Sequence, residues 1–282
     1  MSKVIISADS TCDLSKEIID RYSLNICHCP VTLGNESRID GIDVFPTDLF
    51  EYYDRTGDLA KTSAVNYQGY TDHFKKLLKQ GDAVVHFCIS AEMSSMYNNA
   101  KLAAEDIGNV FVIDSRNLST GIALLVIKAA ELAASGVEAQ DIYDKICALT
   151  DNVDASFIID TLTYLYKGGR CSALAMLGAN MLKLKPCIEV KNGKMDVGKK
   201  YRGKLGDVLL EYAKARLSDI NNIDKSRCFV THTMGSYDER VKAVYDYVSG
   251  LGYFDEVLET SAGCTISAHC GPGTLGVLFI KK

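Results

Sequence analysis

The chain has 282 residues, of which 47% are hydrophobic, so it can build a sizeable core in one large or two medium domains. Its formal net charge of -5 excludes the broad basic surplus on which nonspecific nucleic-acid binding depends. The first residues, "MSKVIISADST", show no signal-peptide pattern. The longest apolar stretch, 121–134, carries Lys128 and Glu131 and is too short to cross a bilayer. We therefore expect a cytoplasmic protein without a membrane segment.

The first half of the chain alternates short apolar runs with amphipathic segments. This rhythm predicts a parallel sheet covered by helices on both faces, in which ligands collect at the carboxyl ends of the strands. The expected strands are 3–7, 25–33, 82–90 and 109–114, and the expected helices are 15–22, 67–81, 94–108 and 121–136.

The second half, from about residue 155, has a different pattern. Alternating residues on either side of Asn192 and Gly193 predict a hairpin over 188–198. We expect an N-terminal α/β domain over 1–155 and a C-terminal α+β domain with antiparallel pairing over 156–282. No Pro/Gly/Ser-rich linker marks the boundary, so the domains should pack closely. Further strands are expected at 226–233, 253–260 and 273–282, with helices at 204–220 and 237–250.

Small hydroxyl residues follow or precede several of these elements, in "ADSTCD", "KTSAVN", "AEMSSMY" and "SRNLSTG". Each loop alone is explained by helix capping, because Ser and Thr are favoured N-cap residues. Four such loops at one edge of a sheet favour a polar or anion-binding site there. No nucleotide-binding fingerprint of glycines is present.

The ten cysteines are scattered and form no Cys-x-x-Cys pair, which predicts buried thiols rather than disulfides or zinc. The segment "CHC" at 27–29 is the nearest approach to a metal-binding cluster. In a strand, Cys27 and Cys29 would lie on one face and His28 on the other. We therefore predict no metal site.

Seven segments, in order over nearly the whole chain, resemble the DegV family of bacterial fatty-acid-binding proteins, some of which are the binding subunits of a fatty acid kinase. They are "ADSTCDL", "KTSAVN", "SAEMSSMYNNAK", "VIDSRNLSTG", "TLTYLYKGGRCS…LG…LKLKPCIEVKNGK", "KKYRGK" and "SAHCGPGTLGVLF". The resemblance implies a two-domain α/β fold with one fatty acid buried in a tunnel between the domains. It also implies no catalytic activity in this chain alone and no cofactor. A separate ATP-using kinase subunit would phosphorylate the bound carboxylate to an acyl phosphate.

Matched residue by residue, the family's carboxylate site falls on Thr62, Ser63, Ser94, Ser95 and His269. Two segments depart from the family pattern, since this chain has "TSAVN" for the usual "TSQPS" and Ser94-Ser95-Met96 for a Ser-Gly-Thr. Serine at 95 preserves the backbone donor of that loop only if its φ angle is negative.

The resemblance gives two arginines another role. Arg170 of "KGGR" and Arg202 of "YRGK" are expected to serve the encounter with the kinase rather than lipid binding, since the guanidinium pairs with phosphate or carboxylate. From its composition, the apolar segment 172–182, "SALAMLGANML", is expected to line the tunnel or to form ordinary core.

His269 stands two residues before a Gly-Pro-Gly turn and the last apolar run, and four roles are open to it. As a metal ligand it lacks partners other than Cys270. As a general base it lacks a reaction. As a donor to a buried carboxylate it fits the family, and such a neighbour would favour its protonated form. A purely structural histidine remains the alternative.

Three other functions remain open. In a serine hydrolase acting on a lipid or ester, Ser94 and His269 would form a triad with Asp9 or Asp114, although no G-x-S-x-G motif is present. A nucleotide-dependent enzyme and a DNA-linked or structural module are the others.

Overall fold

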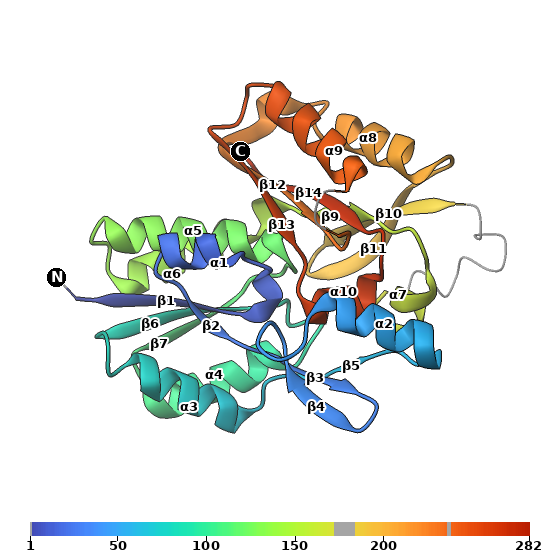
Figure 1. The fold of residues 1–282 in the computed structure, drawn as a ribbon. Coiled ribbons are helices and arrows are strands. Elements are labelled where there is room, and N and C mark those ends of the chain that lie inside the picture. Colours follow the sequence, from blue (N-terminus) through green and yellow to red (C-terminus); the bar gives the residue numbers. More distant parts are fainter. Residues whose placement is uncertain (1, 172–183, 236–237) are drawn as a thin grey trace.

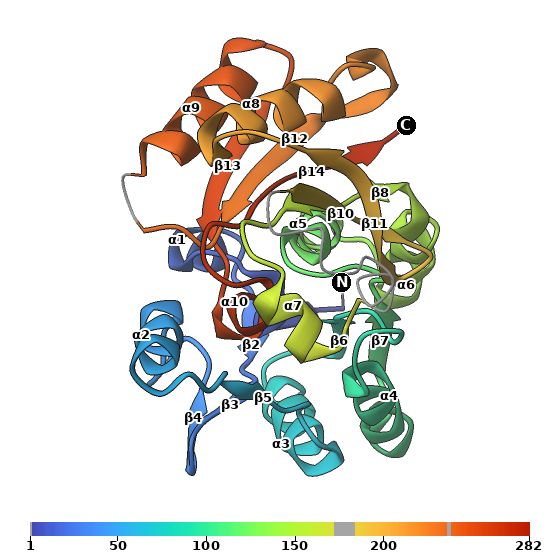
Figure 2. The same cartoon turned by 90° about the vertical axis from the view of Figure 1, so that its right-hand side faces the viewer.

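The structure is a computed structural model that describes residues 2–171, 184–235 and 238–282. Two sheets lie on either side of a long central helix, α5, Thr120–Ala134 (Figures 1 and 2). This arrangement confirms a mixed α/β fold with a parallel sheet and a separate second sheet. The segment 172–182, expected to line a tunnel, lies outside the described residues.

The first sheet is entirely parallel, as predicted. Its strand order is β2 (Asn25–Cys27), β1 (Val4–Asp9), β6 (Ala83–Cys88) and β7 (Val110–Asp114). Every residue of β6 is buried, which explains its largely apolar run, interrupted by His86. Helices cover both faces, with α3 (Tyr67–Leu77) and α4 (Met96–Ile107) on one, and α1 (Lys16–Arg21), α5 and α6 (Ala139–Cys147) on the other (Figure 1).

The expected single strand over 25–33 is wrong, because two strands in different sheets replace it. The chain leaves the first sheet after Cys27 and starts β3 at Pro30, a residue that strands accept at their first position. β3 (Pro30–Leu33) pairs with β4 (Glu36–Ile39) and β5 (Lys61–Thr62) in a small antiparallel sheet, and α2 (Pro46–Thr56) lies between β4 and β5 in the chain.

The second sheet is mixed rather than purely antiparallel, since β12 and β13 run parallel. A crossover through α9 (Glu239–Gly250) separates these two strands and permits that pairing. The predicted hairpin of β10 and β11 is confirmed, with Asn192 and Gly193 at φ 50° and 78° in its turn. The strand order is β11 (Lys194–Tyr201), β10 (Lys185–Lys191), β9 (Ser156–Ile158), β14 (Leu275–Lys281), β12 (Ile223–His232) and β13 (Glu256–Ser261), with β8 (Val153–Asp154) also paired to β14.

The two faces of this sheet are both buried. Along β12, Cys228 and Val230 pack with α9 and α8 (Leu205–Arg216), whereas Phe229 belongs to the core around α5. Because side chains alternate along a strand, one strand serves two cores. The central position of α5 explains why it is apolar on nearly all sides.

Polar contacts also join the two halves of the chain. Ser90, after β6, donates a 2.7 Å hydrogen bond to the carbonyl of Gly193 at the hairpin tip. Arg227 of β12 reaches Glu131 of α5 and the hydroxyl of Tyr22. The division into domains after residue 155 remains a prediction.

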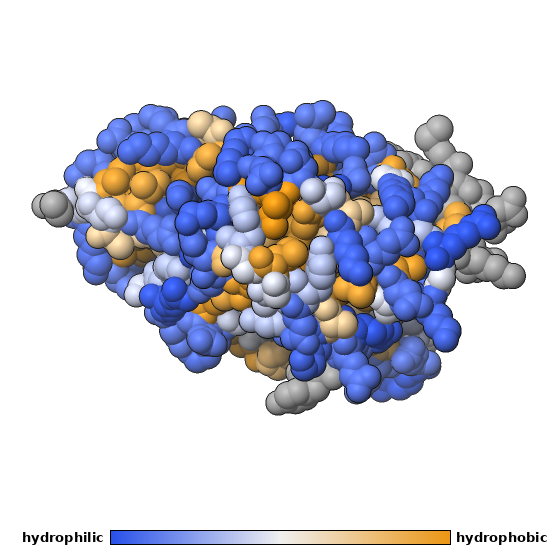
Figure 3. Space-filling view, turned by 90° about the horizontal axis from the view of Figure 1, so that it is seen from above, coloured by the Kyte–Doolittle hydropathy of each residue, from blue (hydrophilic) through white to orange (hydrophobic). Residues whose placement is uncertain are grey.

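No described helix combines the length and the apolar composition that crossing a membrane requires. Seen from above, one face of the molecule is mainly hydrophilic, with apolar side chains in separate patches (Figure 3).

Candidate functional site

The five residues expected at the carboxylate site, which come from three distant segments, line one cavity of about 200 Å³. Thr62 ends β5 and Ser63 follows it, Ser94 and Ser95 precede α4, and His269 lies on α10 (Cys264–Cys270). Ser95 has a φ of −77°, so serine replaces the family's glycine without strain.

His269 contacts two of the segments singled out in the sequence. Its Nε2 lies 2.9 Å from Oγ1 of Thr62. Its Nδ1 has no hydrogen-bond partner among the described residues and packs against Gly168 of "KGGR", where a Cβ atom would lie only 2.4 Å away. The ring therefore has a fixed place between β5 and α7 (Thr163–Gly168).

His269 lies before the Gly-Pro-Gly turn, as expected, but on a helix, α10, that the sequence did not predict. The N-cap residue of this helix is Gly263, which has no side chain to accept a hydrogen bond from the first amides. Instead, Asp13 accepts a 2.8 Å hydrogen bond from the Gly263 amide, and Asp40 accepts bonds of 2.8 and 3.2 Å from the amides of Cys264 and Thr265. These two side chains satisfy the free amides at the helix N-terminus.

The Gly-Pro-Gly turn after α10 is fixed by its contact with the segment before "KGGR". Gly271 has a φ of +74°, and a Cβ atom there would lie 2.6 Å from the Tyr164 ring. Gly273 has a φ of +77°, and a Cβ atom there would lie too close to Cβ of Asp160. The two segments that most specifically carry the family resemblance are therefore in direct contact.

The rest of the cavity is largely apolar, which the polar loops did not predict. The polar exceptions are Arg170, Thr265 and Thr11. Thr11 is fully buried, and its Oγ1 has no hydrogen-bond partner among the described residues. The apolar lining comes from Ile89, Met93, Met96, Leu118, Met195 and Ile266, with Met195 supplied by the hairpin. Because these apolar residues come from separate segments, no local sequence pattern marks them as the lining of one cavity.

Burial and, to a smaller extent, the nearby charge of Arg170 together lower the pKa of His269 from 6.5 to about 4. The expected protonated form is therefore disfavoured in the structure as it stands. A carboxylate in the cavity would act in the opposite direction, because it stabilises the imidazolium.

Arg170 lines the cavity beside His269, although the sequence indicated a role away from the ligand. It also lines a second, larger cavity of about 630 Å³, which shares Thr62 and His269 with the first. Arg202 is exposed and lines neither of these two cavities.

The residues considered for a hydrolase triad are not assembled as one. Asp9 is engaged by His86 and Tyr70, and Asp114 accepts backbone amides. Neither carboxylate bonds to His269, whose Nδ1 has no partner among the described residues. A triad requires a group that orients that nitrogen.

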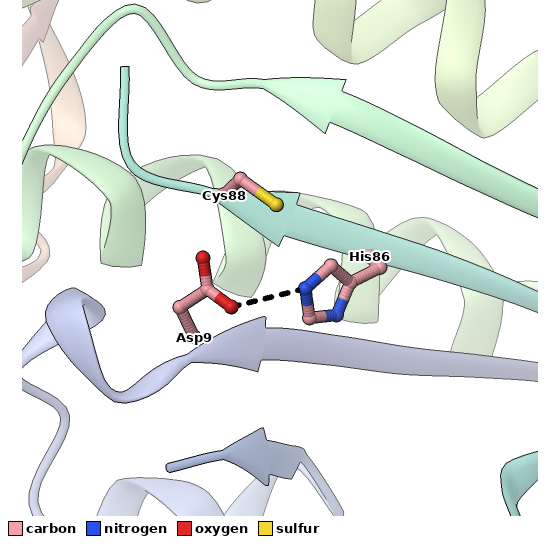
Figure 4. Close-up of side chains that lie close together, drawn as sticks. All are labelled: Asp9, His86 and Cys88. Atoms are coloured by element: carbon pink, nitrogen blue, oxygen red, sulfur yellow. Dashed lines mark hydrogen bonds and ion pairs between the residues drawn. The ribbon is translucent and has the colours of Figure 1, made fainter. Parts of the chain in front are cut away.

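Asp9, His86 and Cys88 form a buried group that the sequence did not indicate (Figure 4). Their potential ligand atoms lie within 4.8 Å of one another, a spacing compatible with a metal ion. Oδ1 of Asp9, however, already accepts a 2.8 Å bond from Tyr70 and lies 3.2 Å from His86 Nε2. Burial raises the pKa of the Cys88 thiol well above its usual value, which keeps the thiol protonated. These contacts favour a hydrogen-bonded network in the core over a metal site.

Comparison with known proteins places the chain in a family. The model of the DegV family, described as uncharacterised protein, DegV family, matches residues 3–282. A DegV domain-containing protein of Clostridium perfringens is 28% identical over 285 residues, covering all of both chains.

Two solved structures are similar in sequence as well as in fold. A DegV family protein of Thermus thermophilus, described by its fatty acid binding, is 25% identical with a TM-score of 0.91 and full coverage of both chains. A stearic acid-binding protein of Eubacterium ventriosum is 29% identical with a TM-score of 0.84, covering 100% of this chain and 99% of the other. The match over almost every residue and the shared fold show that this chain belongs to the DegV family.

Proposed function

We propose that this protein binds a long-chain fatty acid, with the carboxylate at Thr62, Ser63, Ser94, Ser95 and His269. The observation that carries the proposal is the convergence of these hydroxyls and one imidazole on a cavity that is otherwise largely apolar. A buried carboxylate needs several hydrogen-bond donors, and these residues supply them without a lysine.

The position of α4 supports the same head-group site. This helix begins at Met96, directly after Ser94 and Ser95 at the cavity, so its free amides and positive dipole end favour an anion there. The φ angle of Ser95 keeps the backbone donor of the loop available.

The apolar lining accounts for the choice of an acyl chain as the ligand. Burial contributes about 0.8 kcal/mol per methylene, so a tail of roughly fourteen methylenes offers on the order of 11 kcal/mol before ordering costs are subtracted. The Thermus and Eubacterium relatives, described by fatty acid and stearic acid binding, support this ligand class.

The protein is proposed to act without catalytic activity or cofactor of its own and to present the carboxylate to a separate kinase subunit in the cytoplasm. His269 and Thr62 lie at the boundary of the two cavities, so the carboxylate would be reached from the larger one. Arg202, exposed and outside both cavities, is the residue assigned to docking of the kinase, while Arg170 stands at the cavity itself.

Native mass spectrometry of the purified protein tests the central claim, followed by denaturing extraction and identification of the lipid. We expect one monocarboxylic acyl chain per protein chain. An extract without fatty acid, together with no shift of the melting temperature on adding palmitate or oleate, would overturn the proposal.

A further inference from the structure

The larger cavity contains a cluster of positive charges. Lys61, Lys167 and Arg170 all line it, and Asp58 is the one acidic residue among its described lining residues. Since the whole chain carries a formal net charge of -5, this local excess of positive charge contrasts with the rest of the protein.

None of these three cations forms an ion pair with a described carboxylate. Arg170 donates to the carbonyl of Gly168, and the Lys167 amine lies 5.7 Å from the centre of the Tyr53 ring. Many other lysines and arginines of the described chain do pair with a carboxylate within 4.0 Å. Unpaired cations around one cavity attract an anion, particularly a divalent one.

Neutral polar groups complete the lining. Thr32, Asn35 and Tyr52 offer hydroxyl and amide donors from the β3–β4 segment and α2. The cavity also adjoins the proposed carboxylate site, because Thr62 and His269 line both. A group attached to a carboxylate oxygen at these two residues would therefore extend into the larger cavity.

We propose that the larger cavity is a phosphate subsite, in which Lys61, Lys167 and Arg170 hold a dianionic phosphate group beside the carboxylate site. Lysine ammonium groups and a guanidinium fork are the side chains that bind phosphate most strongly. The phosphate is carried by the acyl ligand itself or arrives as free phosphate. The acyl-linked form rests on the proposed function, whereas the free form does not.

Binding of hexadecyl phosphate and of palmitate is compared in the parent, in Lys61→Gln/Lys167→Gln and in a control, Lys75→Gln/Lys79→Gln. The control removes the same charge from two exposed lysines of α3 and its flank. We expect the first double variant to lose hexadecyl phosphate affinity by about tenfold or more while its palmitate affinity changes by less than about twofold. The loss should shrink at high salt, because these lysines are exposed.

A separate arm uses inorganic phosphate alone and reads the melting temperature. A rise in the parent and in the control, absent from Lys61→Gln/Lys167→Gln, supports a subsite for free phosphate. If the parent and this variant respond alike to both phosphate probes, the subsite is refuted. If the parent binds neither palmitate nor hexadecyl phosphate, the proposed function fails, and the inorganic phosphate arm alone then decides the subsite.

Discussion

Nε2 of His269 lies 2.9 Å from Oγ1 of Thr62, although 207 positions separate these residues in the chain. The contact joins helix α10 to strand β5 at the boundary of two cavities, one with a largely apolar lining and the other with a cluster of cations. The same two side chains can therefore contact a ligand's head group in either cavity.

Replacing His269 by alanine should weaken fatty acid binding by about 1–3 kcal/mol, because a buried charged acceptor loses one hydrogen bond. Thr62→Ala and Ser94→Ala should act in the same direction and non-additively with His269→Ala, since all three would contact one group. Titration with a fluorescent fatty acid measures the effect. His28→Ala serves as the control, because His28 is bonded to the Asp40 carbonyl and lines neither cavity. Unchanged affinity in a folded His269→Ala variant would place the head group elsewhere.

A methyl group at position 168 should displace the imidazole. The Cβ atom of Gly168→Ala would lie 2.4 Å from Nδ1 of His269, so the ring must turn and its distance to Thr62 must change. We expect roughly tenfold weaker fatty acid binding, the equivalent of one hydrogen bond at about 1.4 kcal/mol. Gly250→Ala is the matched control, since Gly250 also ends a helix and has open space around its Cα. Equal binding by both variants would show that the ring does not depend on this contact.

Asp40 should contribute to stability through the helix that it caps. Its carboxylate accepts bonds from the amides of Cys264 and Thr265 and from the hydroxyls of Thr265 and Ser10. Asp40→Asn turns one acceptor into a donor facing donors, which we expect to cost about 2 kcal/mol or more in the free energy of unfolding.

Chemical denaturation measures this cost. Asp20→Asn, which removes an exposed carboxylate paired with Lys16, should change the free energy of unfolding by less than about 1 kcal/mol. A similar small change in Asp40→Asn would mean that the helix does not need its cap.

The pH dependence of stability should carry the signature of His269. Its pKa is about 4 in the fold and 6.5 in the unfolded chain, so between these values the unfolded state binds the extra proton. The free energy of unfolding of the ligand-free protein should therefore fall as the pH drops from 6.5 towards 4, and this contribution should be constant above 6.5. Denaturation of the parent and of His269→Gln across this range gives the difference. A parent and variant with parallel pH profiles would contradict the assignment.

The affinity for a fatty acid should rise as the pH drops, whereas the stability of the ligand-free protein should fall. A carboxylate beside His269 raises the imidazole pKa, so binding takes up a proton. The affinity for an ionised fatty acid should therefore increase as the pH is lowered towards the pKa that His269 has in the ligand-free protein. Isothermal titration in buffers of different ionisation enthalpy detects that proton uptake, and its absence from a His269→Gln variant is the control.

The sequence was informative wherever structure depends on a local pattern. The apolar runs around Val84 and Val112 predicted parallel strands, and Asn192-Gly193 predicted the hairpin turn, because these signals lie within a few residues. Helix α10 was missed for the opposite reason. Its N-terminal amides are bonded to Asp13 and Asp40, more than 200 positions away, and its own start has no capping side chain.

The cavity lining shows the same dependence on local pattern. Thr62, Ser94 and His269 were predicted through resemblance to a family and line the cavity, whereas Thr11 and Met195, which also line it, were missed because only the fold brings their segments together. The larger cavity draws on several separate segments, so no single window of sequence predicted its cluster of cations.

The position of β14 determines how late in translation the second sheet can be completed. This strand is inserted between β9 and β12, and α10, immediately before it, carries His269. A nascent chain that has been translated only as far as α9 therefore lacks His269 and leaves the edges of β9 and β12 unpaired. Such edges are templates for aggregation, so translation stalled at this stage should make the nascent protein a client of chaperones.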